Sequence, residues 1–292
     1  MRGWQEGLVL AHLGQGIAVE SSGQVYLCQT RRQLDTVAVG DRVMWIHSAP
    51  DQGRIEQILP RSSILARPAR NETIKPVAAN IDTVYVVLAG APPCDFLLID
   101  QYLAVCEHWK IKAGLILNKI DLPLTAETEQ ELVYYRELGY PLLRVSSHLG
   151  IGLGELKLAL KNQTSIFTGQ SGVGKSSLTN ALLPDMALKT NTLSKTSKHG
   201  RHTTTAATLY HLPDGGDLID SPGVAIFGLA GLNEHELAQG YKEFIPFIGQ
   251  CRFNDCRHAN DKDCAVRSAV EQGQISASRY QRFLKLKQKM LP

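Results

Sequence analysis

A glycine-rich segment in the middle of the chain, residues 169–176, has the residue types and spacing needed to hold a phosphate group. It fits the pattern G-x-x-x-x-G-K-[ST], in which backbone N–H groups converge on the phosphate at the positive end of the following helix. Lys175 would reach the β- and γ-phosphates, and the Ser176 hydroxyl would hold Mg²⁺. The expected contacts are Gly169, Gln170, Ser171, Gly172, Val173, Gly174, Lys175, Ser176 and Ser177.

A second motif indicates which nucleotide this loop binds. Asn118-Lys119-Ile120-Asp121 follows directly on the apolar run 112–117, at a strand end, where α/β sheets bind ligands. The Asp121 carboxylate can accept hydrogen bonds from N1–H and the exocyclic amine of guanine, whereas adenine offers no such pair of donors. Asn118 would brace the loop, and the stem of Lys119 would lie over the base. The motif favours GTP, with an ATP-using kinase or ATPase as the alternative that nucleotide competition would test.

Weaker motifs follow two other predicted strands and open a third. Ser146 and Ser147 would bring a backbone N–H to the guanine carbonyl oxygen. In Asp220-Ser221-Pro222-Gly223, the Asp220 carboxylate would bind Mg²⁺ through water and the Gly223 N–H would meet the γ-phosphate. Of the three threonines at 203–205, Thr204 is expected to complete the Mg²⁺ shell, unless this segment is only a Ser/Thr-rich loop.

Hydrophobic spacing predicts the elements that position these motifs. Apolar runs alternate with segments of helical period, which is typical of an α/β domain with a mostly parallel sheet covered on both faces. The expected strands are 81–88, 112–117, 142–145, 165–168, 205–212 and 217–219, and the expected helices are 96–109, 127–138, 153–160 and 176–183. The segment 96–109 carries apolar residues at helical spacing, namely Leu98, Tyr102, Val105, Cys106 and Trp109.

Short apolar runs at about ten-residue spacing, without a helical period, precede this domain. They cover 8–13, 17–19, 24–28, 41–46 and 53–59 and predict a small antiparallel barrel of the oligonucleotide-binding (OB) type. Arginines in or near its loops could contact RNA or be ordinary surface residues, and the sequence does not decide between these. They are Arg31, Arg32, Arg54, Arg61, Arg67 and Arg70.

The C-terminal part carries a cluster of metal-ligand residues, Cys251-x4-Cys256-x-His258-x5-Cys264. Three sulfurs and one nitrogen are the ligand set of a closed, structural Zn²⁺ site. His258 could instead be an ordinary polar surface residue. The loop also carries Arg252, Arg257, Lys262 and Arg267, which would suit an RNA surface.

The last predicted helix, residues 279–289, contains five positive and no negative side chains. Tyr280, Phe283 and Leu284 could pack one face while the charges point outward. Two interpretations stay open, a solvated helix and an element that contacts phosphates.

Length and composition fit a multidomain globular protein. The 292 residues are 43% hydrophobic and 20% charged, with a net charge of +3. We expect a barrel at 1–67, a linker at 68–76, an α/β domain at 77–230 and a mainly helical zinc-binding domain at 231–292. No signal-peptide core or membrane-length run is present, so we expect a cytoplasmic monomer that does not bind membranes.

The order of the motifs along the chain resembles that of a known protein family. Guanine recognition comes first, followed by the phosphate loop and then the segments at 203–205 and 220–223, whereas common GTPases begin with the phosphate loop. A circular permutation moves the termini and keeps the site. With its leading barrel and trailing cysteines, the chain resembles the RsgA (YjeQ/EngC) family of bacterial GTPases that depend on the small ribosomal subunit.

This resemblance implies GTP hydrolysis stimulated by the 30S subunit, with GTP-dependent binding to and release from 16S rRNA late in maturation. It also implies Mg²⁺ with GTP or GDP, one structural zinc ion and His258 as its fourth ligand. An RNA-binding module in which nucleotide only maintains the fold stays open as an alternative.

Catalysis needs a group that orients the attacking water. Many GTPases carry a glutamine after the D-x-x-G motif, but here the residue is Val224, which can neither donate to nor accept from water. Unaided hydrolysis should therefore be slow. His202, beside the threonine run, is the candidate for this role. In the RsgA family that the chain resembles, a histidine at this place is thought to orient the water. Alternatively, His202 only contacts RNA or a phosphate.

Overall fold

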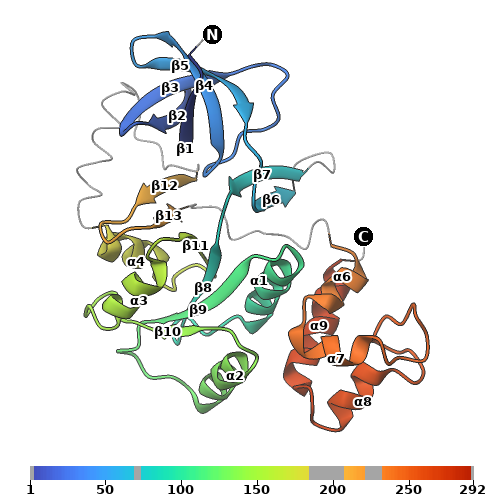
Figure 1. Cartoon of the computed structure of the whole chain (residues 1–292). Coiled ribbons are helices and arrows are strands. Elements are labelled where there is room, and N and C mark those ends of the chain that lie inside the picture. The colour runs from blue at the N-terminus through green and yellow to red at the C-terminus, as the bar shows by residue number, and fades with distance from the viewer. Residues whose placement is uncertain (1–2, 69–73, 184–206, 221–231, 291–292) are drawn as a thin grey trace.

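The computed structural model describes residues 3–68, 74–183, 207–220 and 232–290 (Figure 1). The N-terminal part is a closed five-stranded barrel, as predicted, but one of its strand pairs is parallel and not antiparallel. Its strands are β1 (Gln5–Leu13), β2 (Gly16–Ser21), β3 (Gln24–Thr30), β4 (Arg42–Ala49) and β5 (Gln52–Ile58). Pairing of β1 with β4, in the register Gln5↔Trp45, closes the barrel around the fully buried Trp45. A Cβ atom at Gly53 would lie 2.4 Å from the Trp45 ring, so β5 can pass this ring only with glycine there.

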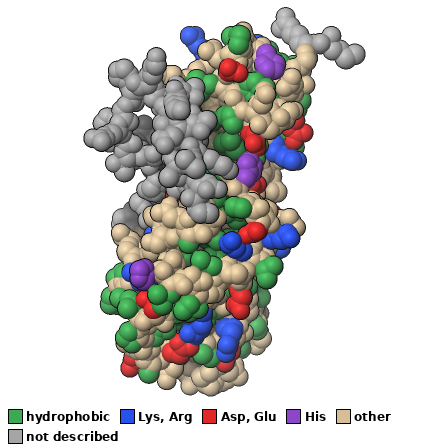
Figure 2. All heavy atoms as spheres, turned by 90° about the vertical axis from the view of Figure 1, so that its left-hand side faces the viewer, with side chains coloured by type: hydrophobic (Ala, Val, Ile, Leu, Met, Phe, Trp, Pro, Cys, Tyr) green, Lys and Arg blue, Asp and Glu red, His purple; other side chains and the backbone are tan. Residues whose placement is uncertain are grey.

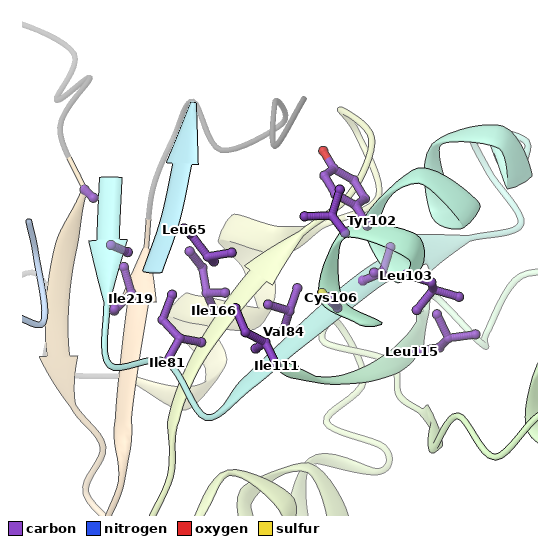
Figure 3. Packing of buried hydrophobic residues seen from close by; sticks show 14 of the residues in the cluster. Leu65, Ile81, Val84, Tyr102, Leu103, Cys106, Ile111, Leu115, Ile166 and Ile219 are labelled. Carbon is purple, nitrogen blue, oxygen red and sulfur yellow. The ribbon is translucent and has the colours of Figure 1, made fainter. Parts of the chain in front are cut away.

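The prediction of a linker without regular structure at 68–76 is wrong in part. The end of β6 (Ile64–Pro68) and the start of β7 (Ile74–Ala79) lie in it, and the two strands pair antiparallel. Leu65 and Ala78 are buried in the same hydrophobic core as Val84 and Ile166, and Figure 3 shows Leu65 among its side chains. Two prolines and several charged residues mask the strand pattern locally, and the pairing itself depends on contacts that the local pattern does not contain.

The central sheet contains β8 (Thr83–Ala89), β9 (Lys112–Asn118), β10 (Leu142–Arg144), β11 (Thr164–Thr168), β12 (Thr208–His211) and β13 (Asp217–Asp220). In the order β10-β9-β8-β11-β13 all neighbours are parallel, and β12 is antiparallel to β13. Strand β12 also pairs with β1 of the barrel, at Ala11↔Thr208. The barrel and the central sheet are therefore hydrogen-bonded into one sheet, which the sequence did not predict.

Helices cover both faces of the central sheet. They are α1 (Phe96–His108), α2 (Ala126–Glu137), α3 (Leu153–Leu160) and α4 (Lys175–Leu182). Side chains alternate along β8, so Val84 and Leu88 pack with α1 and α2, whereas Tyr85 and Val87 pack with α3 and α4. Figure 3 shows Val84 near Cys106 of α1. The helix is one residue shorter than expected, because α1 ends at His108, and Trp109 is 44% exposed although it belongs to the apolar pattern.

The C-terminal part is helical, as predicted. It contains α6 (Glu234–Gln239), the 3-10 helix η3 (Lys242–Phe244), α7 (Ile245–Ile248), α8 (Ala265–Glu271) and α9 (Ala277–Lys289). Tyr280 and Phe283 of α9 are buried, but so are Arg279 and Lys287. The expectation that the charges of this helix point outward is therefore wrong in part. Lys285 and Lys289 are exposed, whereas Arg279 and Lys287 pair with carboxylates on other elements. Within the described part of the chain, every helix is too short or too polar to cross a membrane.

Candidate functional site

Three glycines shape the loop between β11 and α4. Gly169, Gly172 and Gly174 have φ angles of 130°, 83° and 94°, in the region that disfavours other residues. A Cβ atom at Gly169 would lie 2.2 Å from the Val87 carbonyl oxygen, and one at Gly174 would lie 2.3 Å from the Asn118 side chain. Glycine is therefore required both by the backbone angles and by close packing against the ends of neighbouring strands.

The side chain of Asn118 joins the guanine-type motif to this loop. Its Nδ2 donates a hydrogen bond to the Val173 carbonyl oxygen at 2.9 Å, and its Oδ1 accepts one from the Ser147 N–H at 3.1 Å. Lys119 donates from Nζ to the carbonyl oxygen of Gly172 at 2.7 Å. Asn118 is fully buried, so its bonds are protected from water. The structure thus brings together three motifs that the sequence separates.

The Asp121 side chain is exposed beside this junction. The Ser146 hydroxyl donates a hydrogen bond to its carboxylate. This bond is the main cause that lowers the pKa of Asp121, and His148 and Lys119 add smaller favourable charge interactions. The group is therefore ionised at neutral pH and can only accept hydrogen bonds, which matches two adjacent donors on a base.

The phosphate end of the site contains a lysine and a carboxylate. Lys175 begins α4, and its Nζ donates to the carbonyl oxygens of Gly169 and Gln170 at 2.7 and 2.8 Å. Asp220 ends β13, the strand next to β11. Burial lowers the pKa of Lys175 and raises that of Asp220, and their mutual attraction opposes both shifts. Ser176, in the first turn of α4, is exposed. The donor set of one carboxylate and one hydroxyl fits a hydrated Mg²⁺ ion.

Several predicted residues lie outside the described residues. They are His202, Thr203, Thr204, Thr205, Gly223 and Val224. The roles assigned to them from the sequence stay predictions.

Sequence reasoning missed the loop between β8 and α1. The Ala91 carbonyl oxygen accepts a hydrogen bond from Lys119 Nζ at 2.8 Å. The Asp95 N–H donates to Oε1 of Gln170 at 3.1 Å, and Pro92 lies 3.5 Å from the position of a Cβ atom on Gly172. The loop therefore lines the phosphate loop. Its place after the carboxyl end of a buried strand was the available signal, since the other motifs follow strands in the same way.

The cysteine and histidine side chains of the C-terminal part form a compact cluster. The ligand atoms of Cys251, Cys256, His258 and Cys264 lie within 4.8 Å of one another. Nδ1 of His258 is 3.5 Å from Sγ of Cys251 and 3.6 Å from Sγ of Cys264. These separations suit four ligands of one tetrahedral ion.

The pKa values of the thiols in this cluster also favour binding of a cation. Burial raises the pKa of the Cys256 thiol to about 12 and also raises that of Cys264. Buried thiols would thus stay protonated, whereas a divalent cation would stabilise the thiolates. The donor set of three sulfurs and one imidazole nitrogen fits Zn²⁺ without an open position.

Several cations proposed for RNA contact have protein partners. Arg61 forms a two-bond ion pair with the buried Asp41, at 2.7 and 2.8 Å. Arg31 and Arg54 both pair with Glu56. Arg61 is therefore structural, and Arg70 lies outside the described residues. Figure 2 shows positive and negative side chains mixed on one face of the molecule, without a large field of one sign among the coloured atoms.

Comparisons with known proteins agree with this geometry. The RsgA GTPase family matches residues 58–230. "Small ribosomal subunit biogenesis GTPase RsgA" of Hahella chejuensis is 44% identical over 98% of this chain and 84% of its own length. The protein of the same name from Chromohalobacter salexigens is 46% identical over 95% of this chain and 84% of its own length.

Solved structures extend the similarity to the fold. YjeQ from Thermotoga maritima superimposes with a TM-score of 0.79, at 31% identity over 99% of both chains. YloQ, described as a circularly permuted GTPase, gives 0.76 at 26% identity over 99% of this chain and 95% of its own. The predicted permutation is confirmed. This chain belongs to the RsgA GTPase family and is a circularly permuted GTP hydrolase.

Proposed function

We propose that this protein hydrolyses GTP on the small (30S) ribosomal subunit and acts late in the maturation of that subunit. The observation that carries the guanine specificity is the contact of Asn118 with Val173, which puts the exposed Asp121 at a fixed place beside the phosphate loop. The assignment to the subunit is supported by relatives named for small ribosomal subunit biogenesis.

In this proposal the base and the phosphates are bound by different loops. Asp121 accepts hydrogen bonds from guanine, and Ser146 and Ser147 hold the loop near the guanine carbonyl. Residues 169–177 surround the phosphates, and Lys175 offsets their negative charge. The Gly223 N–H contacts the γ-phosphate.

Mg²⁺, when bound, would neutralise phosphate charge and be held by Ser176, Thr204 and, through water, Asp220. Asp220 suits this role because it ends β13 close to Lys175. His202 orients the attacking water in place of the usual glutamine, because Val224 cannot. Slow basal turnover follows because Val224 cannot orient the water, and fast turnover on the subunit follows because His202 does so there.

The barrel and the C-terminal domain bind 16S rRNA, and the nucleotide state controls binding and release. Zn²⁺ at Cys251, Cys256, His258 and Cys264 is structural and stabilises the loop that carries Arg257 and Lys262, whose side chains are exposed. The protein acts as a cytoplasmic monomer.

GTP turnover with and without purified 30S subunits tests the proposal. We expect strong stimulation by 30S and little by 50S subunits, with GTP but not ATP displacing a fluorescent GDP analogue. His202→Ala should reduce stimulated turnover by about 10²-fold or more, the range for removing a general base, while leaving GDP affinity within twofold. Absence of stimulation would favour an RNA-binding module that uses nucleotide only for its fold.

A further inference from the structure

The C-terminal domain is docked on α1 by a buried ion-pair network. Asp100 of α1 is fully buried, and its two carboxylate oxygens accept from different arginines of α9. Arg279 Nη1 donates to Oδ1, and Arg282 Nε donates to Oδ2, both at 2.5 Å. One carboxylate of the GTPase domain thus receives two guanidinium groups from the C-terminal domain.

Neighbouring groups complete this network. Arg279 also donates to Glu243 within the C-terminal domain, and Arg282 donates to Glu131 of α2 at 2.7 Å. The Arg279 side chain is fully buried. Removing Asp100 or one of its two arginines would leave a charge without compensation in a site shielded from water, so the bonds to Asp100 hold the two domains in one arrangement. Glu131 lies at the accessible edge of the network, with 18% of its side chain exposed.

Close packing accompanies the ion pairs. A Cβ atom at Gly240, just after α6, would lie 2.7 Å from the Ala104 carbonyl oxygen of α1. Tyr241 and the Arg279 guanidinium are in cation–π contact, with 4.7 Å between the guanidinium carbon and the ring centroid. The C-terminal domain therefore contacts α1 along more than one turn, which restrains the helix in rotation and along its axis.

The same helix contacts the phosphate loop at its other side. The side chains of Tyr102 and Thr168 interact, since Thr168 opposes the rise that burial causes in the pKa of Tyr102. Thr168 is the last residue before Gly169. At the start of α1, the Asp95 side chain caps the helix by accepting from the Leu98 N–H at 3.0 Å, while its own N–H donates to Gln170. Asp100 is five residues from Asp95, about 7.5 Å along the axis at 1.5 Å per residue.

From these contacts we infer that Asp100 is a positioning residue for the nucleotide site. Its docking on Arg279 and Arg282 fixes α1, and α1 in turn holds the loop containing Ala91 and Asp95 against Lys119 and Gln170. The inference rests on the proposed binding of guanine nucleotide by residues 169–177. If a partner that loosens this docking weakens nucleotide binding, linkage requires that the nucleotide weakens binding of that partner by the same factor.

The test measures release of a fluorescent GDP analogue from the full-length protein. Arg282→Gln and Asp100→Asn should each speed release by about fivefold or more, the lower end of common coupling factors. Glu131→Gln is the matched control, because it removes the other partner of Arg282 on α2 and leaves Asp100 paired. It should change release by less than twofold. Zinc content and melting temperature, measured in parallel, identify any variant that fails to fold.

A double-mutant cycle separates positioning from a general loss of stability. If α1 acts through Gln170, then Arg282→Gln should accelerate release less in a Gln170→Ala background than in the wild type. Arg282 is partly accessible, so its variant keeps the test usable if Asp100→Asn does not fold. Wild-type-like release from a folded Arg282→Gln protein, or an equal effect of Glu131→Gln, would overturn the inference. Failure of the wild type to bind the GDP analogue would instead refute the proposed function, and the inference with it.

Discussion

The side-chain amide of Asn118 and the carbonyl oxygen of Val173 lie 2.9 Å apart although 55 residues separate them in the chain. This bond joins the loop after β9 to the loop after β11. In the permuted chain order the guanine motif precedes the phosphate loop, yet parallel strands bring both loops to the same edge of the sheet. The geometry of the site is thus independent of where the chain begins.

Asn118→Ala should weaken GTP and GDP binding alike. It leaves the buried Val173 carbonyl oxygen and the Ser147 N–H without their partner, which costs about 1–3 kcal/mol, or about 5–150-fold in affinity. Titration with fluorescent GDP and a non-hydrolysable GTP analogue measures the loss. Asn254→Ala, at an exposed position in the cysteine-rich loop, is the control. Affinities within twofold of wild type would contradict the bracing role.

Asp121→Asn should change the base preference from guanine to xanthine. Xanthine carries a carbonyl oxygen where guanine has its exocyclic amine, and the asparagine amide can donate to that oxygen. We expect xanthine nucleotides to bind at least about tenfold more tightly than guanine nucleotides, a difference of about 1.4 kcal/mol. Competition binding provides the measurement, with the exposed Asp255→Asn as control. An unchanged preference for guanine would show that Asp121 does not contact the base.

His211 should make stability depend on pH above neutrality. It bridges Asp217 of β13, at 2.6 Å, and Glu20 of the barrel, at 2.8 Å. The hydrogen bond to Asp217, followed by that to Glu20, raises the pKa of His211 from 6.5 to about 9. Because the folded-state pKa is the higher one, the stabilisation is complete below pH 6.5 and is lost as the pH rises through 9.

The measurement is the urea midpoint of unfolding from pH 6 to pH 10 for wild type and His211→Gln. The wild type should exceed the variant most at the acidic end, and the difference should shrink towards pH 10. A variant without a change at a titratable group, Asn254→Ala at an exposed position, should show no such convergence. A difference independent of pH would mean that the bridge is not charged.

Cys256→Ser should lower the zinc content from one ion per chain and destabilise the protein by about 3 kcal/mol or more, since binding free energy of a structural ion contributes to folding. Cys94→Ser is the control, because Cys94 is half-buried and outside the cluster. Elemental analysis and thermal unfolding provide the two readouts. Full zinc content in the Cys256 variant would contradict the ligand set.

Local patterns sufficed for the motifs and for most elements. The glycines at 169, 172 and 174 and the buried strand before Asn118 predicted loops that the structure places at one sheet edge. They succeeded because strand, tight turn and helix are each encoded within a few neighbouring residues. The strands β6 and β7 were missed because their stability comes from pairing with each other and from the burial of Leu65 and Ala78.

The sequence by itself determined the fold class, the order of the motifs and the chemistry available at each site, because residue type and spacing carry that information. Only the tertiary structure decided which charges face inward and how the domains contact each other. Arg279 belongs to a run that resembles a solvated basic helix, yet it is fully buried against Asp100, 179 residues away in the chain. No local pattern contains such a pair, since a cation is buried only where the fold supplies a carboxylate to compensate its lost hydration.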